Sequence, residues 1–157
     1  MEFEIIRLSA KDIPFVAEIE KKCFLSPWSE RSFKASFNCQ AAVWFGALNE
    51  GRLIGFCGAQ IVAPEGEIIN IAVDPQFRRN GVGEALLRKM LDTCSVIANI
   101  WFLDVRESNT AAQALYKKIG FFTAGKRIGY YAKPREDALV MKLDLSNRRP
   151  FDADSFI

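Results

Sequence analysis

The chain has 157 residues, of which half are hydrophobic and a quarter charged, and its formal net charge is +2. These values are typical of one water-soluble globular domain and argue against a dedicated nucleic-acid binder or a membrane span. The chain has no histidine, which excludes Ser-His-Asp and Cys-His catalysis and the usual histidine-ligated zinc enzymes.

The N-terminal half predicts a strand, two helices and a hairpin. A strand over residues 3–8 precedes Ser9, which forms a capping-box pattern with Asp12. The helix that follows is expected to bury one face, made by Phe15, Val16, Ile19 and Cys23. A second, short helix begins after Ser29, and the hairpin strands are residues 41–48 and 52–62.

The C-terminal half alternates strands and helices. Apolar patterns predict strands at 67–73, 97–105, 121–132 and 138–145, and helices at 82–94 and 109–119. The complete order predicts an α+β (mixed α/β) domain over residues 1–145, with about seven strands in one mixed sheet and about four helices. Residues 146–157 are expected to form a loose C-terminal tail.

Localisation is predicted from the cysteines and the N-terminus. Cys23, Cys39, Cys57 and Cys94 lie far apart and form no CxxC pair, which favours reduced thiols over disulfides or a metal site. The first seven residues lack the basic and apolar segments of a signal peptide. We therefore expect a cytoplasmic protein with neither a metal nor a membrane partner.

The strongest functional signal follows the strand at 67–73. An arginine pair, Arg78-Arg79, and two glycines, Gly81 and Gly83, come immediately before a helix. This arrangement directs backbone N–H groups and the positive end of a helix dipole at one point, where an anion such as a phosphate can bind. Leu86 replaces the third glycine of a dinucleotide fingerprint, and no Gly-Lys-Ser/Thr is present. The alternative is a strand–helix turn that needs glycine only for its shape.

This run, from Asn70 to Glu84, resembles the acetyl-CoA motif R/Q-x-x-G-x-G/A of the GNAT N-acetyltransferases. A second block, from Asp104 through Asn109 and Tyr116 to Phe121, resembles the next conserved block of that family. Three further runs, at residues 23–30, 129–131 and 135–141, are similar to the RimI group of bacterial enzymes within it. That group acetylates the N-terminal alanine of a ribosomal protein.

The resemblance implies the GNAT acyl-CoA N-acyltransferase fold, with acetyl-CoA as cosubstrate. The pyrophosphate would bind the backbone N–H groups of the loop, and the pantetheine arm would pair with the preceding strand. A backbone N–H near Val73 would hold the developing oxyanion. Asn109 matches a CoA-contacting asparagine, although helix N-cap is its other role. The expected cofactor-binding residues are Ile71, Ala72, Val73, Arg79, Asn80, Gly81, Val82, Gly83, Glu84 and Asn109.

Tyr116 matches the family's general acid, which would protonate the leaving thiolate. Asp104 stands where RimI-like enzymes carry a glutamate, so it is the expected base despite its shorter side chain. Glu67, acting through water, is the alternative base. The structural alternative for Asp104 is an ion pair, with Arg106 as the candidate partner.

The resemblance also implies a peptide slot walled by Trp28, Tyr130 and Tyr131. Glu30 and Asp137 would attract a basic second residue of the substrate. The predicted activity is therefore acetyl transfer in a ternary complex to the N-terminal amine of a ribosomal protein. Direct contact with nucleic acid is not expected. The open alternatives are acetylation of lysine or small amines, and a CoA-binding regulatory module with weak chemistry.

Overall fold

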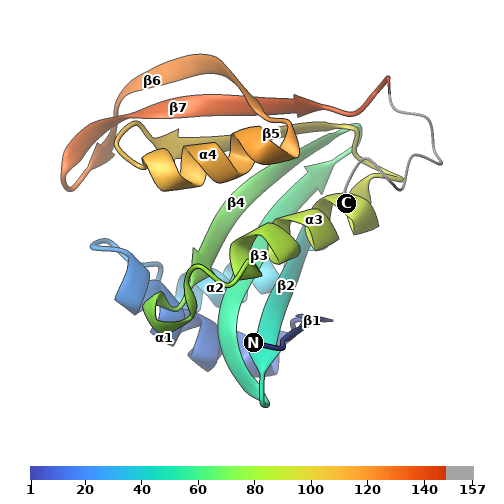
Figure 1. Cartoon of the computed structure of the whole chain (residues 1–157), viewed down its shortest axis with the longest axis vertical. Coiled ribbons are helices and arrows are strands. Elements are labelled where there is room, and N and C mark those ends of the chain that lie inside the picture. Colours follow the sequence, from blue (N-terminus) through green and yellow to red (C-terminus); the bar gives the residue numbers. More distant parts are fainter. Residues whose placement is uncertain (148–157) are drawn as a thin grey trace.

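The computed structural model describes residues 1–147, and its elements follow the predicted order (Figure 1). The strands are β1 (Glu4–Arg7), β2 (Ala42–Asn49), β3 (Arg52–Val62), β4 (Glu65–Val73), β5 (Ile100–Arg106), β6 (Phe122–Ala132) and β7 (Arg135–Asp144). The helices are α1 (Ile13–Cys23), α2 (Glu30–Phe37), α3 (Val82–Cys94) and α4 (Thr110–Ile119), with 3-10 turns η1 (Ala10–Asp12) and η2 (Pro75–Phe77). Residues 148–157, which make up most of the predicted tail, lie outside the described residues.

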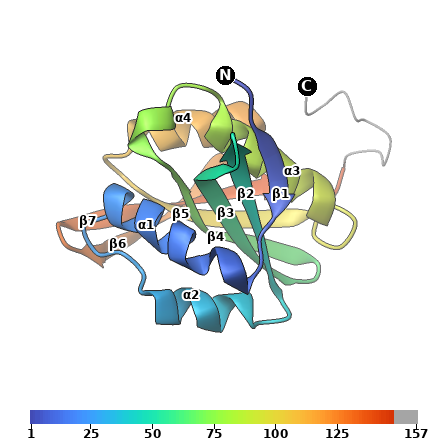
Figure 2. The same cartoon turned by 90° about the horizontal axis from the view of Figure 1, so that it is seen from below.

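The seven strands of residues 1–147 form one sheet, in the order β1-β2-β3-β4-β5-β7-β6. Only β4 and β5 are parallel, and every other neighbouring pair in this sheet is antiparallel. Helices α1 and α2 cover one face, and α3 and α4 cover the other (Figure 2). The predicted mixed α/β fold is confirmed. In this part of the chain no helix is long and apolar enough to cross a membrane.

Helix α1 buries Val16 and Ile19 as predicted, but not Phe15. Phe15 is 56% exposed, whereas Glu20 is 2% exposed and Val16 is fully buried. The prediction of an inward Phe15 is wrong, because the buried residues follow the helical spacing that starts at Ile13 and includes Ala17 and Glu20. One carboxylate therefore lies in the packed layer between α1 and the sheet.

The parallel pair β4–β5 is held tightly where it begins. Gly66 lies opposite Trp101, which is fully buried and donates from its ring nitrogen to the Ala98 carbonyl at 3.1 Å. A Cβ atom at position 66 would lie 2.6 Å from the Trp101 ring. Glycine is required there because the indole packs directly on the neighbouring backbone.

Further along, β4 and β5 separate. Their register covers only Glu65 to Ile68 against Ile100 to Leu103, although both strands continue for several residues. At the same point β4 has a bulge, because Ala59 pairs with Ile68 and Gly58 pairs with Asn70, which leaves Ile69 unmatched on β4. A bulge bends the strand that carries it. Figure 1 shows β4 and β5 diverging beyond this point, which we call the split.

The end of β4 is fixed by a buried carboxylate. Asp74 is 1% exposed, and it accepts hydrogen bonds from Lys22 at 3.0 Å, from Arg52 at 3.3 Å and from the Gln76 amide at 3.0 Å. Burial acts to raise its pKa, but these hydrogen bonds and the two cations hold the pKa below its ordinary value of 3.8. Asp74 therefore joins α1 and β3 to the loop that follows β4.

We expect Asp74→Asn to destabilise the fold by about 2 kcal/mol at pH 7, because Lys22 and Arg52 lose their charged partner. Since the folded-state pKa is lowered, this stability is present above the unfolded pKa and is lost as the pH falls through the folded value. Urea unfolding of both proteins from pH 7 to pH 3 should show the difference shrinking below about pH 4. Asp92→Asn, at an exposed carboxylate, is the control. An equal loss at every pH would contradict this role.

Candidate active site at the strand split

A cleft of about 660 Å³ lies at the split. It is lined by the separated parts of β4 and β5, the connection between α1 and α2, helix α4 and the β6–β7 hairpin. This volume is in the range of small-molecule sites, which are about 300–1,000 Å³. The cleft brings Asp104, Asn109, Tyr116, Tyr130 and Tyr131 to one place, as the sequence predicted for a common site.

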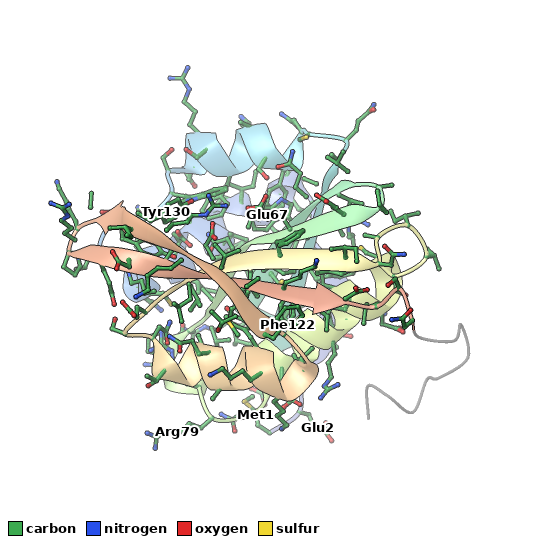
Figure 3. The ribbon with its side chains drawn as sticks, turned by 90° about the horizontal axis from the view of Figure 1, so that it is seen from above. Met1, Glu2, Glu67, Arg79, Phe122 and Tyr130 are labelled. Atoms are coloured by element: carbon green, nitrogen blue, oxygen red, sulfur yellow. The ribbon has the colours of Figure 1, made fainter. Side chains whose placement is uncertain are left out.

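The expected residues reach this region from both faces of the sheet. In Figure 3, Glu67 and Tyr130 lie on the side of α2, and Arg79 lies on the opposite side, beyond α4. The same division holds within β5. Leu103 and Val105 belong to the core that α3 and α4 cover, so Asp104 between them faces the other way. The split is thus a passage between two faces.

On the α3–α4 side, the loop before α3 exposes backbone N–H groups. Arg79 has a φ of 66° and Gly81, the N-cap of α3, has a φ of 76°. A left-handed arginine is strained, and such strain is common at functional sites. Because the first N–H groups of a helix have no acceptor within it, the amides near Gly81 are available to an anion.

The side chains of this loop are mostly engaged within the protein. Asn80 donates to the carbonyls of Phe77 and Arg78 at 3.1 and 3.2 Å. Glu84 forms ion pairs with Arg88 and Lys118, both at 3.0 Å. Among the described residues nothing pairs with the exposed Arg79 guanidinium, so the anion-binding capacity of the predicted residues 79–84 lies in their backbone and in Arg79.

The β5-facing side of β4 is a second source of free backbone groups. The Asp74 amide donates to Ile54 of β3 at 2.8 Å. Successive residues of a strand direct their N–H groups to alternate sides, so the amides of Val73 and Ile71 point away from β3 into the split. The backbone N–H group of Ala72 is directed toward β3, and its side chain is buried in the core that α1 and α2 cover.

A cysteine that sequence reasoning did not place in the site also lines the cleft. Cys23 donates its thiol to the Val73 carbonyl at 3.3 Å and accepts from Arg78 at 3.5 Å. Burial is the main cause that raises its pKa, so the thiol is protonated at neutral pH. Protonation makes it a poor nucleophile.

Tyr116 lies on α4, and 6% of it is exposed. Burial, helped by the nearby Cys57 and Tyr131, raises the pKa of its phenol well above the ordinary value of 10. No described residue forms a hydrogen bond with its hydroxyl, yet this oxygen is not sealed from solvent. Tyr116 therefore presents a neutral O–H donor to the cleft.

Two carboxylates lie on the α2 side. Asp104 pairs with Arg127 at 3.2 Å, so the structural alternative of an ion pair is present, but with Arg127 and not with the candidate partner Arg106. The side chain of Glu67 forms no hydrogen bond or ion pair with another residue of the described chain. Burial is the main cause that raises the pKa of Glu67; Asp104 raises it further and Arg127 lowers it.

Arg106 instead clamps the β6–β7 hairpin. It donates to the carbonyls of Lys133 and Pro134 at 3.1 and 3.0 Å, and pairs with Glu136 at 3.3 Å. Its guanidinium lies 4.2 Å from the centre of the Tyr131 ring. The clamp fixes the hairpin that carries Tyr130 and Tyr131 at the edge of the cleft.

A further cavity of about 690 Å³ lies on the α2 side, and because the residues predicted to wall a peptide slot line it, we keep the name peptide slot for it. It shares Trp28, Asp104, Tyr130 and Tyr131 with the cleft and adds Glu67. The structure does not bring Glu30 or Asp137 to either cavity. Glu30 is exposed at the start of α2, and Asp137 accepts a hydrogen bond from the Gly129 amide at 2.7 Å.

Sequence reasoning gave no site role to Glu20, Cys23 and Arg106, which line the cleft, or to Arg127, which pairs with Asp104. Asn109 fulfils its predicted capping role, since its side chain accepts from the Ala112 amide at 3.1 Å, and it also lines the cleft.

Comparisons with known proteins agree with this geometry. Residues 13–121 match the model of the acetyltransferase (GNAT) family. The [ribosomal protein bS18]-alanine N-acetyltransferase of Escherichia coli K12 is 39% identical over 146 compared residues, and the match covers 90% of this chain and 97% of that protein. A putative enzyme of the same name from Bacillus subtilis is 40% identical, over 83% of this chain and 88% of its own.

Among solved structures, the ribosomal-protein-S18-alanine N-acetyltransferase of Escherichia coli superposes with a TM-score of 0.85. It is 35% identical, and the match covers 96% of this chain and 98% of that one. The motifs, the fold and these similarities agree. The chain therefore belongs to the GNAT family and is an acetyl-CoA-dependent N-acetyltransferase.

Proposed function

We propose that the enzyme transfers the acetyl group of acetyl-CoA to the N-terminal alanine of ribosomal protein bS18, by direct attack within a ternary complex. The observation that carries this proposal is the split, which joins an anion-binding loop on one face to a carboxylate-lined slot on the other. The Escherichia coli relative is named for its action on this protein, and the Bacillus subtilis relative is named as a putative enzyme of the same kind. That similarity does not favour lysine or small-amine acetylation, or a regulatory module.

The donor fits the α3–α4 side of the split. The CoA pyrophosphate would bind the N–H groups of residues 79–84, where the helix dipole adds positive potential. The amide-rich pantetheine arm would pair with the free N–H groups of Ile71 and Val73, as an added strand does. A methyl group at Gly83 would lie 3.6 Å from Leu115 and 3.7 Å from Val73, so packing does not require glycine there. We infer that glycine at position 83 instead leaves room for a ligand beside the backbone amide.

The reaction then needs one attack and two proton transfers. The amine nitrogen attacks the thioester carbonyl carbon, and a backbone N–H of the split stabilises the resulting oxyanion. Collapse of the tetrahedral intermediate breaks the C–S bond, and Tyr116 donates its proton to the departing thiolate. The proton of the attacking amine leaves toward the carboxylates on the α2 side.

We assign the base to Glu67, acting through water, in place of the Asp104 that the sequence favoured. Glu67 has both oxygens free of protein partners, and its raised pKa makes it a better proton acceptor near neutral pH. One oxygen of Asp104 is occupied by Arg127. The negative charge of Asp104 would assist the base by raising the pKa of Glu67.

A panel of short peptides tests the acceptor. Because an α-amine has a pKa near 8 and a lysine near 10.4, the neutral nucleophile is about a few hundredfold more abundant at an N-terminus. Peptides that begin with alanine should react fastest among those that begin with Ala, Ser, Gly or Met, and N-blocked lysine peptides should not react. Acetylation of the blocked lysine peptides alone would overturn the proposal.

Tyr116→Phe should lower kcat by about 10²-fold, because the thiolate must then leave without a proton donor. Acetyl-CoA binding, measured by calorimetry, should survive, since a phenylalanine can keep the ring contact with Phe121. Tyr131→Phe removes a half-buried phenol that lines the same cleft and should lower kcat by less than about tenfold. Equal losses in both variants would argue against a specific role for Tyr116.

Glu67→Gln should lower kcat by about 10²-fold, whereas Asp104→Asn should leave substantial turnover. Because Asp104 raises the pKa of Glu67, its neutralisation should shift the acid limb of the kcat profile to lower pH. The same peptide is used throughout, so its own amine contributes equally. Full activity of Glu67→Gln, with loss in Asp104→Asn, would identify Asp104 as the base.

A further inference from the structure

Glu20 is the most completely buried carboxylate that faces the cleft. It is 2% exposed on α1 and lines the cleft at the split. No cation within residues 1–147 forms an ion pair with it. A buried carboxylate without a cation is costly, so the position has a role other than the stability of α1.

Each carboxylate oxygen of Glu20 accepts one hydrogen bond. The Trp28 backbone amide donates to Oε1 at 3.2 Å, and the Asn70 side-chain amide donates to Oε2 at 2.9 Å. Burial raises the pKa of this carboxyl, and these two hydrogen bonds lower it in part. One side chain thus links α1 to two segments that lie far apart in the sequence.

The first of these segments is the connection between α1 and α2, residues 24–29. Its apolar side chains Phe24 and Leu25 are 41% and 84% exposed, so they add little packing. Its far end is held by the Trp28 ring, which lies 5.2 Å from Phe33 and 6.2 Å from Trp44, and by the bond to Glu20. Trp28 lines both the cleft and the peptide slot.

The second segment is β4 at the split. Asn70 is the first paired residue after the bulge at Ile69, where β4 leaves β5. Glu20 therefore fixes the wall of the peptide slot relative to the place where the thioester would lie. This spacing decides whether an amine in the slot reaches the carbonyl carbon.

We propose that Glu20 is a positioning residue, which holds the 24–29 connection against the split by accepting hydrogen bonds from the Trp28 amide and the Asn70 side chain, and so sets the affinity for the peptide N-terminus. The proposal rests on the function proposed above. It predicts a defect in peptide binding and not in the chemical step or in acetyl-CoA binding.

Three variants test the hydrogen-bond pattern. Asn70→Asp replaces the donor to Oε2 with a second carboxylate, and at about pH 8, where a proton shared by the two acids is disfavoured, Glu20 should withdraw and release Trp28. Glu20→Gln keeps a carbonyl for the Trp28 amide, and its amide group can donate to a turned Asn70. In the double variant E20Q/N70D, the Gln side chain donates to the new Asp and still accepts from Trp28.

The first readout is hydrogen–deuterium exchange of residues 24–29, which does not depend on activity. Asn70→Asp should lower protection of this segment by about tenfold, and E20Q/N70D should restore it. Glu18→Gln, at an exposed carboxylate of the same helix, is the control and should change nothing. Unchanged protection in Asn70→Asp, or no recovery in the double variant, would overturn the proposal.

The second readout is steady-state kinetics with an N-terminal alanine peptide. Asn70→Asp should raise the peptide KM by about tenfold and change kcat and the acetyl-CoA affinity by less than about threefold, with recovery in E20Q/N70D. Should Asn70→Asp fail to fold, Glu20→Leu removes the same acceptor and should give the same rise. A loss confined to kcat would overturn the positioning role. If the variants show the expected exchange pattern but the wild-type protein acetylates no free N-terminus, only the proposed function is overturned.

Discussion

The separation of β4 and β5 after Ile68 and Leu103 is the constraint on which the site depends. Backbone polar groups inside a sheet are normally paired, so two neighbouring strands that part must leave N–H and C=O groups to another partner. The protein holds the strands together at Trp101 and Gly66 and bends β4 with a bulge at Ile69. It fixes the end of β4 through Asp74. The unpaired backbone is thus held in a defined position, where a ligand can form hydrogen bonds with it.

The split also separates the chemistry by face. Tyr116 comes from α4 on one face, where burial keeps the phenol protonated. Glu67 lies on the other face, and so does Asp104, which alternates with the core residues Leu103 and Val105. A neutral acid and a carboxylate of raised pKa can then serve the leaving thiolate and the attacking amine without exchanging protons directly. The two substrates would approach from opposite faces and meet where the strands part. This arrangement removes the need for a covalent enzyme intermediate, although Cys23 lies in the same cleft.

Much of this could be predicted from the sequence, because its signals are local. The loop with Gly81 and Gly83, the Asn109 cap and the order of strands and helices depend on neighbouring residues, and the structure has them as expected. Contacts between distant strands could not be predicted in this way. The pairing of Asp104 with Arg127, in place of Arg106, depends on how β6 is placed beside β7 and β5. Glu20 was missed because a hydrophobic pattern does not select a charged residue for a buried stripe.

The central claim is that both substrates occupy the split together and that the amine attacks the thioester directly. Initial rates measured while acetyl-CoA and an N-terminal alanine peptide are both varied test it most directly. The account predicts double-reciprocal lines that intersect, as a ternary complex requires. Parallel lines, which indicate an acetyl-enzyme formed before the peptide binds, would contradict it.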